Sequence, residues 1–234
     1  MKKILLVVLT ISLLAIPAVA VAQAEGNLLS QGKSYTLVTP ASAAYPDDDS
    51  FKLTDGVKGE RVDDLYFKSP AYVGFNQANK DENGDFVIIL DLGESYDNIK
   101  TLTLSYLAET DMGIYAPQSY SVYIADTAEG SYIHAGSVTI GEDNASGISK
   151  TGVASIELPQ AVTAQYIKFV IHHQEAFERD GTPVTPGWVF IDEIEVYATT
   201  PVPQTNDDSL AVFIILAIIS GSAWVGLKLR KHIA

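Results

Sequence analysis

The stretch from residue 82 to residue 92 reads Glu-Asn-Gly-Asp-Phe-Val-Ile-Ile-Leu-Asp-Leu. Its first four residues form turns readily, and the apolar run that follows has the length of a strand rather than of a helix. Similar short runs recur along the chain between glycine, aspartate, asparagine and proline residues, and no amphipathic helical period interrupts them. This pattern predicts an all-β fold.

Together with this stretch, the other runs predict about eight antiparallel strands, which in one domain favour a β-sandwich. The predicted strands cover residues 34–39, 86–92, 99–107, 119–125, 132–139, 154–158, 166–172 and 189–197. Long loops are expected near residues 40–85, 108–118 and 172–188. The chain has no cysteine, so no disulfide framework can hold this sandwich together.

Both ends of the chain carry sequence patterns typical of targeting or membrane-anchoring segments. Two lysines precede an apolar stretch over residues 4–16, and Ala22-Gln23-Ala24 places small residues where a signal peptidase cuts. Residues 1–24 are therefore predicted to be a signal peptide that is cleaved after Ala24. Near the other end, the segment 209–228 is apolar and carries no charge before Lys228, and the basic residues Arg230 and Lys231 follow it. It is predicted to be a transmembrane helix, with the tail 229–234 in the cytoplasm and the rest of the mature chain outside.

Residues 199–208 form a proline- and threonine-rich linker that contains Val202-Pro203-Gln204-Thr205-Asn206. The order of motif, apolar run and basic tail resembles the sorting signal of sortase-anchored proteins of Gram-positive bacteria. The resemblance implies that a sortase would attack the carbonyl of Thr205 and join the protein to the cell wall. Val202 and Asn206 depart from the common Leu-Pro-x-Thr-Gly motif, whereas four of the five residues of a second motif, Asn-Pro-Gln-Thr-Asn, are present. Wall attachment and a simple membrane tether are therefore both open, and both place the domain on the outer surface.

Charge and motifs exclude several functions. The two ends hold five of the 15 Lys and Arg residues and none of the 29 Asp and Glu residues, so the part between them is strongly acidic. An acidic domain is a poor partner for nucleic acid and for anionic membranes, whereas the charge suits a solvated secreted domain or one that binds cations. The chain has no nucleophile elbow, phosphate-binding loop or zinc motif. We therefore predict that the protein is not an enzyme.

Several motifs occur in an order that is informative as a set. They are Asn27-Leu28-Leu29-Ser30-Gln31-Gly32-Lys33, Lys52-Leu53-Thr54-Asp55-Gly56, the run 86–93, Gly113-Ile114-Tyr115-Ala116-Pro117 and the stretch 189–197, Val-Phe-Ile-Asp-Glu-Ile-Glu-Val-Tyr. In that order they resemble the discoidin, or coagulation-factor type C, domains, a group that includes many bacterial galactose-binding-like carbohydrate-binding modules. The resemblance covers about residues 27–198. It implies a jelly-roll β-sandwich over residues 25–198.

The resemblance also implies a structural calcium ion. In this family the early Asp-Gly turn and the late Glu-x-Glu strand meet, and calcium prefers a shell of carboxylate and carbonyl oxygens. The residues that it implies as ligands are the side chains of Asp55, Glu60 and Glu193 and the carbonyls of Leu53 and Val57. The alternative is that Asp55 is only a turn residue before a glycine and that Glu193 faces solvent.

The family binds its ligand on the loops at one end of the sandwich. A sugar needs an aromatic face for its ring and polar groups for its hydroxyls, and the candidate residues are Tyr45, Tyr66, Tyr115, His173, Phe177 and Arg179. His172 and His173 are adjacent, so one is predicted to point inward and the other outward. We predict a surface-anchored module that binds extracellular glycans without catalysis. The alternative is an adhesive or structural surface protein whose module binds a protein partner.

Overall fold

A computed structural model of the protein describes residues 26–141 and 145–199. The predicted signal peptide, most of the linker, the predicted transmembrane segment and the basic tail lie outside these ranges, as do Ala24 and Thr205. The regular structure of the described ranges consists of strands and two short 3-10 helices, η1 (Gln77–Asn79) and η2 (Thr110–Met112). None of the described residues belongs to a helix long and apolar enough to cross a membrane.

The strands confirm the predicted all-β, antiparallel fold. Eight of them form one antiparallel sheet, in which β1, β10, β4, β7, β5 and β6 follow one another, β2 pairs with β4, and β3 pairs with β10. Their bounds are β1 Asn27–Leu28, β2 Tyr35–Leu37, β3 Val73–Asn76, β4 Asp85–Glu109, β5 Ser119–Ala125, β6 Ile133–Thr139, β7 Ser149–His172 and β10 Trp188–Ala198. A separate hairpin consists of β8 (Phe177–Arg179) and β9 (Thr182–Val184).

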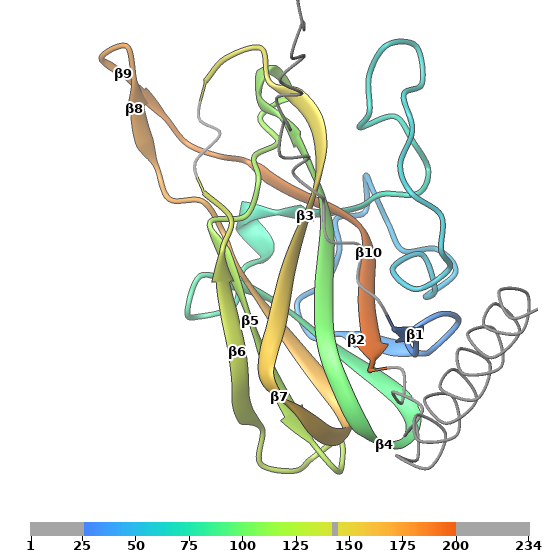
Figure 1. Ribbon diagram of the computed structural model, residues 1–234. Coiled ribbons are helices and arrows are strands. Elements are labelled where there is room, and N and C mark those ends of the chain that lie inside the picture. Colours follow the sequence, from blue (N-terminus) through green and yellow to red (C-terminus); the bar gives the residue numbers. More distant parts are fainter. Residues whose placement is uncertain (1–25, 142–144, 200–234) are drawn as a thin grey trace, which may run out of the picture. The chain divides into compact units, whose positions relative to one another are not determined.

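The two longest strands turn this sheet into a sandwich. β4 and β7 pair along most of their length, with irregular register between Asp91 and Thr101 (Figure 1). One half of the pair joins β2, β5 and β6, and the other half joins β10. The two halves pack face to face. Contacts across the space between them include the Tyr120 hydroxyl on β5, which donates to the carbonyls of Leu102 on β4 and Ala154 on β7. The sequence predicted four strands here, and the structure joins them into two that continue through both layers.

The core lies between the two layers. Phe86, Ile88 and Leu90 in the first half of β4 and Leu102 and Leu104 in the second half are fully buried in one cluster. Burial of each such side chain contributes about 1.5–3 kcal/mol, which lets the fold form without disulfides. Side chains alternate along each strand, so that every second residue of β5, β6 and β7 faces away from the core.

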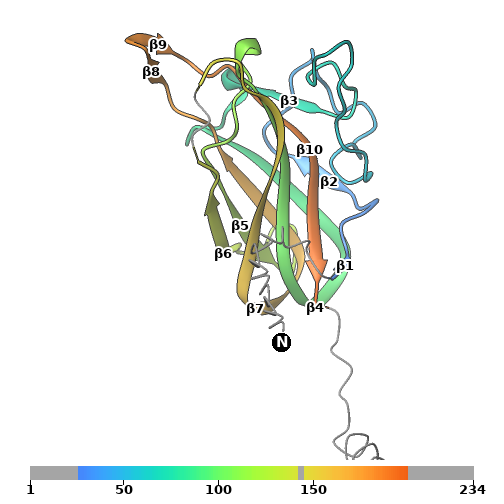
Figure 2. The same ribbon diagram turned by 45° about the horizontal axis from the view of Figure 1, so that its top comes forward.

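Both ends of β4 lie at the same end of the sandwich, since the chain leaves this end at Asp85 and returns to it at Glu109. His172, which ends β7, pairs with Asp85, and Trp188, which begins β10, bridges to Ile114. The loops at this end, which we call the apical end, therefore come from distant parts of the sequence. In Figures 1 and 2 the β8–β9 hairpin projects from it.

Candidate functional site

An aromatic–arginine cluster, formed by Tyr115, Phe177 and Arg179, brings together three of the predicted ligand residues. The Arg179 Nη2 atom donates to the Tyr115 hydroxyl at 2.9 Å. The guanidinium carbon lies 5.8 Å from the Tyr115 ring centroid and 5.7 Å from the Phe177 ring centroid. The two rings meet edge to face with centroids 5.6 Å apart. Guanidinium and both rings thus hold one another in place.

The β8–β9 hairpin positions Phe177 and Arg179. Arg179 pairs with Thr182, which leaves Asp180 and Gly181 as the two turn residues. Both have positive φ, 51° and 75°. This is the backbone of a type I′ turn, for which Asp-Gly is a preferred sequence. The structure forms a hairpin where the sequence pattern predicts a loop, although the Asp-Gly pair is a signal typical of a hairpin.

Tyr45 and Tyr66 lie in a second aromatic group, which packs mainly on itself. The Tyr45 ring centroid lies 4.6 Å from that of Phe190 and 5.4 Å from that of Trp188. The Arg61 guanidinium lies 4.7 Å from the centroid of the Tyr66 ring. A hollow of about 140 Å³ among Tyr45, Phe67, Met112, Ile114, Trp188 and Phe190 is too small for most organic ligands. The structure therefore does not bring Tyr45 or Tyr66 together with the aromatic–arginine cluster.

A larger hollow has a volume of about 440 Å³, and we call it the polar hollow. Part of its lining comes from residues 172–175, which precede β8 in the chain. Its volume falls within the range of small-molecule sites. Hydrogen-bonding side chains supply most of its lining, which consists of Lys80, Asn83, Gly84, Asp85, Gln118, Ser119, His172, His173, Gln174 and Glu175. Such a lining suits a ligand with many hydroxyl groups.

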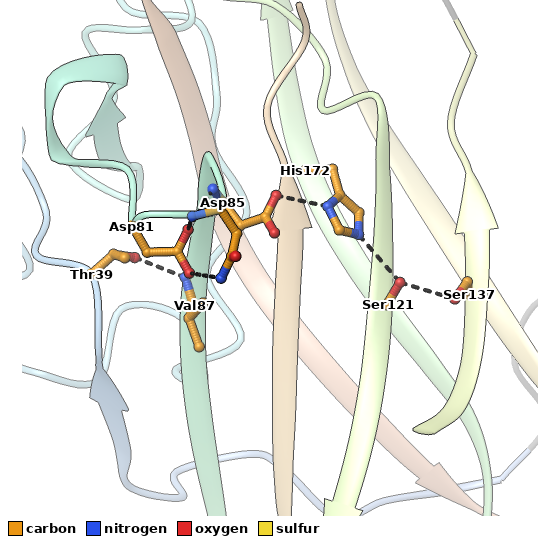
Figure 3. Close-up of polar contacts among 8 residues, drawn as sticks. Thr39, Asp81, Asp85, Val87, Ser121, Ser137 and His172 are labelled. Carbon is orange, nitrogen blue, oxygen red and sulfur yellow. Dashed lines mark hydrogen bonds and ion pairs between the residues drawn. The ribbon is translucent and has the colours of Figure 1, made fainter. Parts of the chain in front are cut away.

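Asp85 and His172 contact each other directly in this lining (Figure 3). The His172 Nδ1 atom lies 2.7 Å from the Asp85 Oδ1 atom, and the Nε2 atom lies 3.3 Å from the Ser121 hydroxyl. Because the carboxylate can only accept, Nδ1 carries a proton, and in the neutral ring Nε2 accepts from Ser121. The imidazole is thereby fixed in one orientation and one tautomer.

The loop that leads into β4 is also fixed. The Asp81 Oδ1 atom accepts from the backbone N–H groups of Asn83 and Asp85, both at 2.9 Å. Burial acts to raise the pKa of Asp81, but the hydrogen bonds donated by Asp85, Asn83 and Gly84 outweigh it and lower that pKa. The predicted turn at residues 82–85 thus places Asp85 at the start of its strand.

His173 also belongs to the lining of the hollow, but it is buried, whereas His172 is half-buried. His173 is 7% exposed, and its ring meets the Phe86 ring at a centroid distance of 5.8 Å. Burial, with a smaller contribution from the charge of Lys80, lowers the pKa of His173 to about 4, so the ring is neutral. The adjacent histidines thus differ in burial, which agrees with the prediction that one of them points inward. The predicted ligand residue His173 is the buried one of the pair, and alternation alone could not show which histidine faces outward.

The early Asp-Gly turn and the late strand also meet. The backbone N–H of Gly56 donates to Glu193 Oε1, and that of Gly59 donates to Asp192 Oδ2 at 2.7 Å. The register of β10 against β4 shifts between Ile191 and Glu193. This β-bulge lets two consecutive carboxylates bond the same loop, where a regular strand would send them to opposite faces.

A bound cation would favour the ionised form of a buried carboxyl group here. Glu193 is 2% exposed, and burial raises its pKa to about 8, with a further contribution from the Asp55 carboxyl group. Asp192 Oδ1 is buried without a hydrogen-bond partner. However, the described ranges contain no group of three or more His, Cys, Asp or Glu side chains that could hold a metal ion. The acidic side chains therefore fit calcium only if main-chain or solvent oxygens complete the shell.

The other predicted calcium ligands are placed less closely. The Leu53 carbonyl already accepts from the backbone N–H of Ile194 at 2.8 Å, although a carbonyl has a second lone pair. Val57 and Glu60 are exposed, and the N–H of Glu60 donates to Ser69. The structure thus brings Asp55, Leu53 and Glu193 to one loop–strand contact, whereas it shows no contact between Glu60 and Glu193.

No protein-family model matches this chain, and no curated protein matches it. Solved structures do resemble it. Chitosan-binding module 1 of a chitosanase/glucanase from Paenibacillus sp. IK-5 shares 16% identity at a TM-score of 0.48, over 74% of this chain and 100% of that one. The module CpGH89CBM32-5 of Clostridium perfringens, solved with GalNAc-β-1,3-galactose, shares 17% sequence identity at a TM-score of 0.47. The match covers 74% of this chain and 100% of that one. The family 32 module of Clostridium perfringens NanJ, solved with galactose, shares 14% sequence identity at a TM-score of 0.46. The match covers 73% of this chain and 97% of that one.

Proposed function

We propose that the protein binds glycans without catalysis, in the polar hollow and against the neighbouring aromatic–arginine cluster. The observation that carries this proposal is the hollow itself, about 440 Å³ in volume and lined mainly by hydrogen-bonding side chains. Phe177 and Arg179 follow directly after the segment that forms one wall of it.

The chemistry of the two parts is complementary. A sugar presents hydroxyl groups that both donate and accept, together with an apolar face of C–H groups. Gln118 and Gln174 can donate and accept, and Asp85 accepts. Phe177 is half-buried, so part of its ring is accessible to the apolar face of a sugar. Because Asp85 and His172 are fixed before a ligand arrives, little side-chain entropy is lost on binding.

A second function is suggested by the distances among Ser121, His172 and Asp85, which resemble those of a serine-hydrolase triad. Two observations favour a binding network instead. Ser121 is only 8% exposed. β5 pairs with β6 on one side and with β7 on the other, so the backbone N–H groups beside Ser121 serve the sheet and leave no oxyanion hole there. Labelling of Ser121 by a fluorophosphonate probe would favour the hydrolase.

The calcium ion and the surface anchor are part of the same proposal. The buried Glu193 beside Asp55 supports a structural cation, which would stabilise a fold without disulfides. The sequence signals at both ends support export and retention at the outer surface. A mature C-terminus at Thr205, measured by mass spectrometry, would establish sortase processing, whereas recovery of residues 209–234 in membranes would establish a membrane tether.

The binding proposal is tested on a glycan array with the full chain in detergent. We expect the wild type to bind a subset of glycans, and Phe177→Ala to weaken that binding. Phe51→Ala is the matched control, because Phe51 is an exposed aromatic residue that does not line the hollow. Binding to no glycan, together with saturable binding of a purified surface protein, would favour the alternative of a protein-binding adhesin.

A further inference from the structure

The sheet face next to the polar hollow carries an ordered row of polar side chains. Across β7, β5 and β6, His172 lies opposite Ser119, which lies opposite Thr139. Two residues further along, Val170, Ser121 and Ser137 face one another in the same way. These residues point away from the core, because Tyr120, Val122 and Ile171 between them are fully buried. We call this surface the outer face.

Hydrogen bonds join the outer face to the hollow. The Ser121 hydroxyl lies 3.3 Å from His172 Nε2 and 2.9 Å from the Ser137 hydroxyl. Ser137 lies in turn 2.8 Å from His134 Nε2. Figure 3 shows most of this chain of contacts, from Asp85 through His172 and Ser121 to Ser137. Three strands therefore present donors and acceptors whose positions are set by one another rather than by solvent.

The row ends in a cationic and aromatic group. Lys168 lies opposite Tyr123, which lies opposite His134. The Lys168 Nζ atom is 5.2 Å from the Tyr123 ring centroid and 4.4 Å from the Tyr132 ring centroid. The side chains of Lys168, Tyr123 and Tyr132 are half-buried, so they are partly accessible on this face. An aromatic ring beside a fixed ammonium group can hold both the apolar face and the hydroxyl groups of a sugar.

We propose that the ligand is an oligosaccharide that begins in the polar hollow and runs over the outer face to Tyr123 and Lys168. This inference rests on the proposed function and extends it. His172 and Lys168 are four positions apart along β7, which corresponds to about 13 Å of strand. That distance exceeds one sugar ring, so a single ring in the hollow does not reach Tyr123, whereas a chain of rings does.

An antiparallel sheet often exposes a polar face to water for solubility alone, and the experiment must distinguish that role from binding. Isothermal titration calorimetry on the full chain in detergent compares galactose with its β-1,4-linked tetramer, and glucosamine with its β-1,4-linked tetramer. We expect the wild type to bind one tetramer at least tenfold more tightly than its monomer. Tyr123→Ala removes about tenfold of tetramer affinity and leaves monomer affinity unchanged.

Two further variants serve as controls for the effect of Tyr123→Ala on tetramer affinity. Tyr123→Phe keeps the ring and is expected to keep the tetramer affinity, which a merely misfolded sheet would not. Tyr96→Ala is the matched control, because Tyr96 is a half-buried tyrosine outside the outer face. Equal affinity for monomer and tetramer, or a tetramer affinity that Tyr123→Ala leaves unchanged, would overturn the inference while the proposed function stands. If neither series binds at any length and no glycan on the array binds either, the proposed function and the inference both fail.

Discussion

Asp85 begins β4 and accepts a 2.7 Å hydrogen bond from the ring of His172, which ends β7. The two residues are 87 positions apart in the sequence, and the antiparallel register places them directly opposite one another. Because both lie at strand ends, they are anchored by the sheet and yet face the polar hollow. This pair connects the hollow with the hydrogen-bonded row on the outer face.

Removal of the Asp85 carboxylate should therefore weaken glycan binding. In Asp85→Ala the imidazole loses the acceptor that fixes its tautomer, and we expect about a tenfold loss of affinity, in line with a hydrogen bond to a charged group. Asp85→Asn keeps an acceptor oxygen and should lose less. Titration calorimetry measures the affinities, and nitrogen chemical shifts of His172 report its tautomer. Unchanged affinity in Asp85→Ala would remove this pair from the site.

His173 should make the fold sensitive to acid. Its pKa is lowered from 6.5 to about 4 in the folded protein, so its contribution is fully present above pH 6.5 and is lost progressively as the pH falls from 6.5 to 4. Between pH 7 and pH 4.5 the free energy of unfolding should fall by about 2–3 kcal/mol on this account. Thermal melting of His173→Phe should show a smaller change in this window. The exposed His134, replaced by glutamine, is the matched control, and equal pH profiles for wild type and His173→Phe would contradict the assignment.

Calcium should raise the melting temperature. A ligand that binds only the folded state at 100 times its dissociation constant adds about 2.7 kcal/mol of stability, which corresponds to several degrees. A chelator should reverse this gain, and Asp55→Asn should abolish the response. Asp48→Asn is the control, because Asp48 is an exposed acid that is not among the predicted calcium ligands. A melting curve that neither calcium nor chelator changes would show that Glu193 is held without a cation.

Tyr120 should affect stability and not binding. Its hydroxyl donates to two carbonyls in the buried space between the layers. Tyr120→Phe leaves both carbonyls without this donor, and we expect a loss of about 1–2 kcal/mol in urea unfolding, with glycan affinity unchanged. A loss of affinity in this variant would indicate that the site depends on the spacing of the layers.

Strand pattern and turn signals were sufficient to predict the all-β fold, and the predicted strand at residues 119–125 has the bounds of β5. They could not predict that β4 continues from Asp85 to Glu109. Gly93 and the polar residues after it indicate a break, with a φ of 80° at Gly93. Pairing with β7 nevertheless resumes beyond an irregular register, which is a property of the partner strand and not of the local sequence.

The candidate site was predictable only in part, because it too depends on how distant strands pair. Phe177 and Arg179 are predictable from the sequence, because they lie together in a long, polar segment over residues 172–186. Asp85, Gln118 and His172 were missed, because each is an ordinary polar residue at a strand end. Only the register of β4 and β7, with the loop before β5, brings them to one hollow.

The most direct test of the central claim is the affinity of Phe177→Ala and Gln118→Ala for the glycan that the wild type binds best on the array. These residues represent the aromatic and the polar part of the site. The proposal predicts that each variant keeps the wild-type melting temperature and loses about tenfold or more in affinity by titration calorimetry. Wild-type affinity in both variants would contradict glycan binding at the apical end.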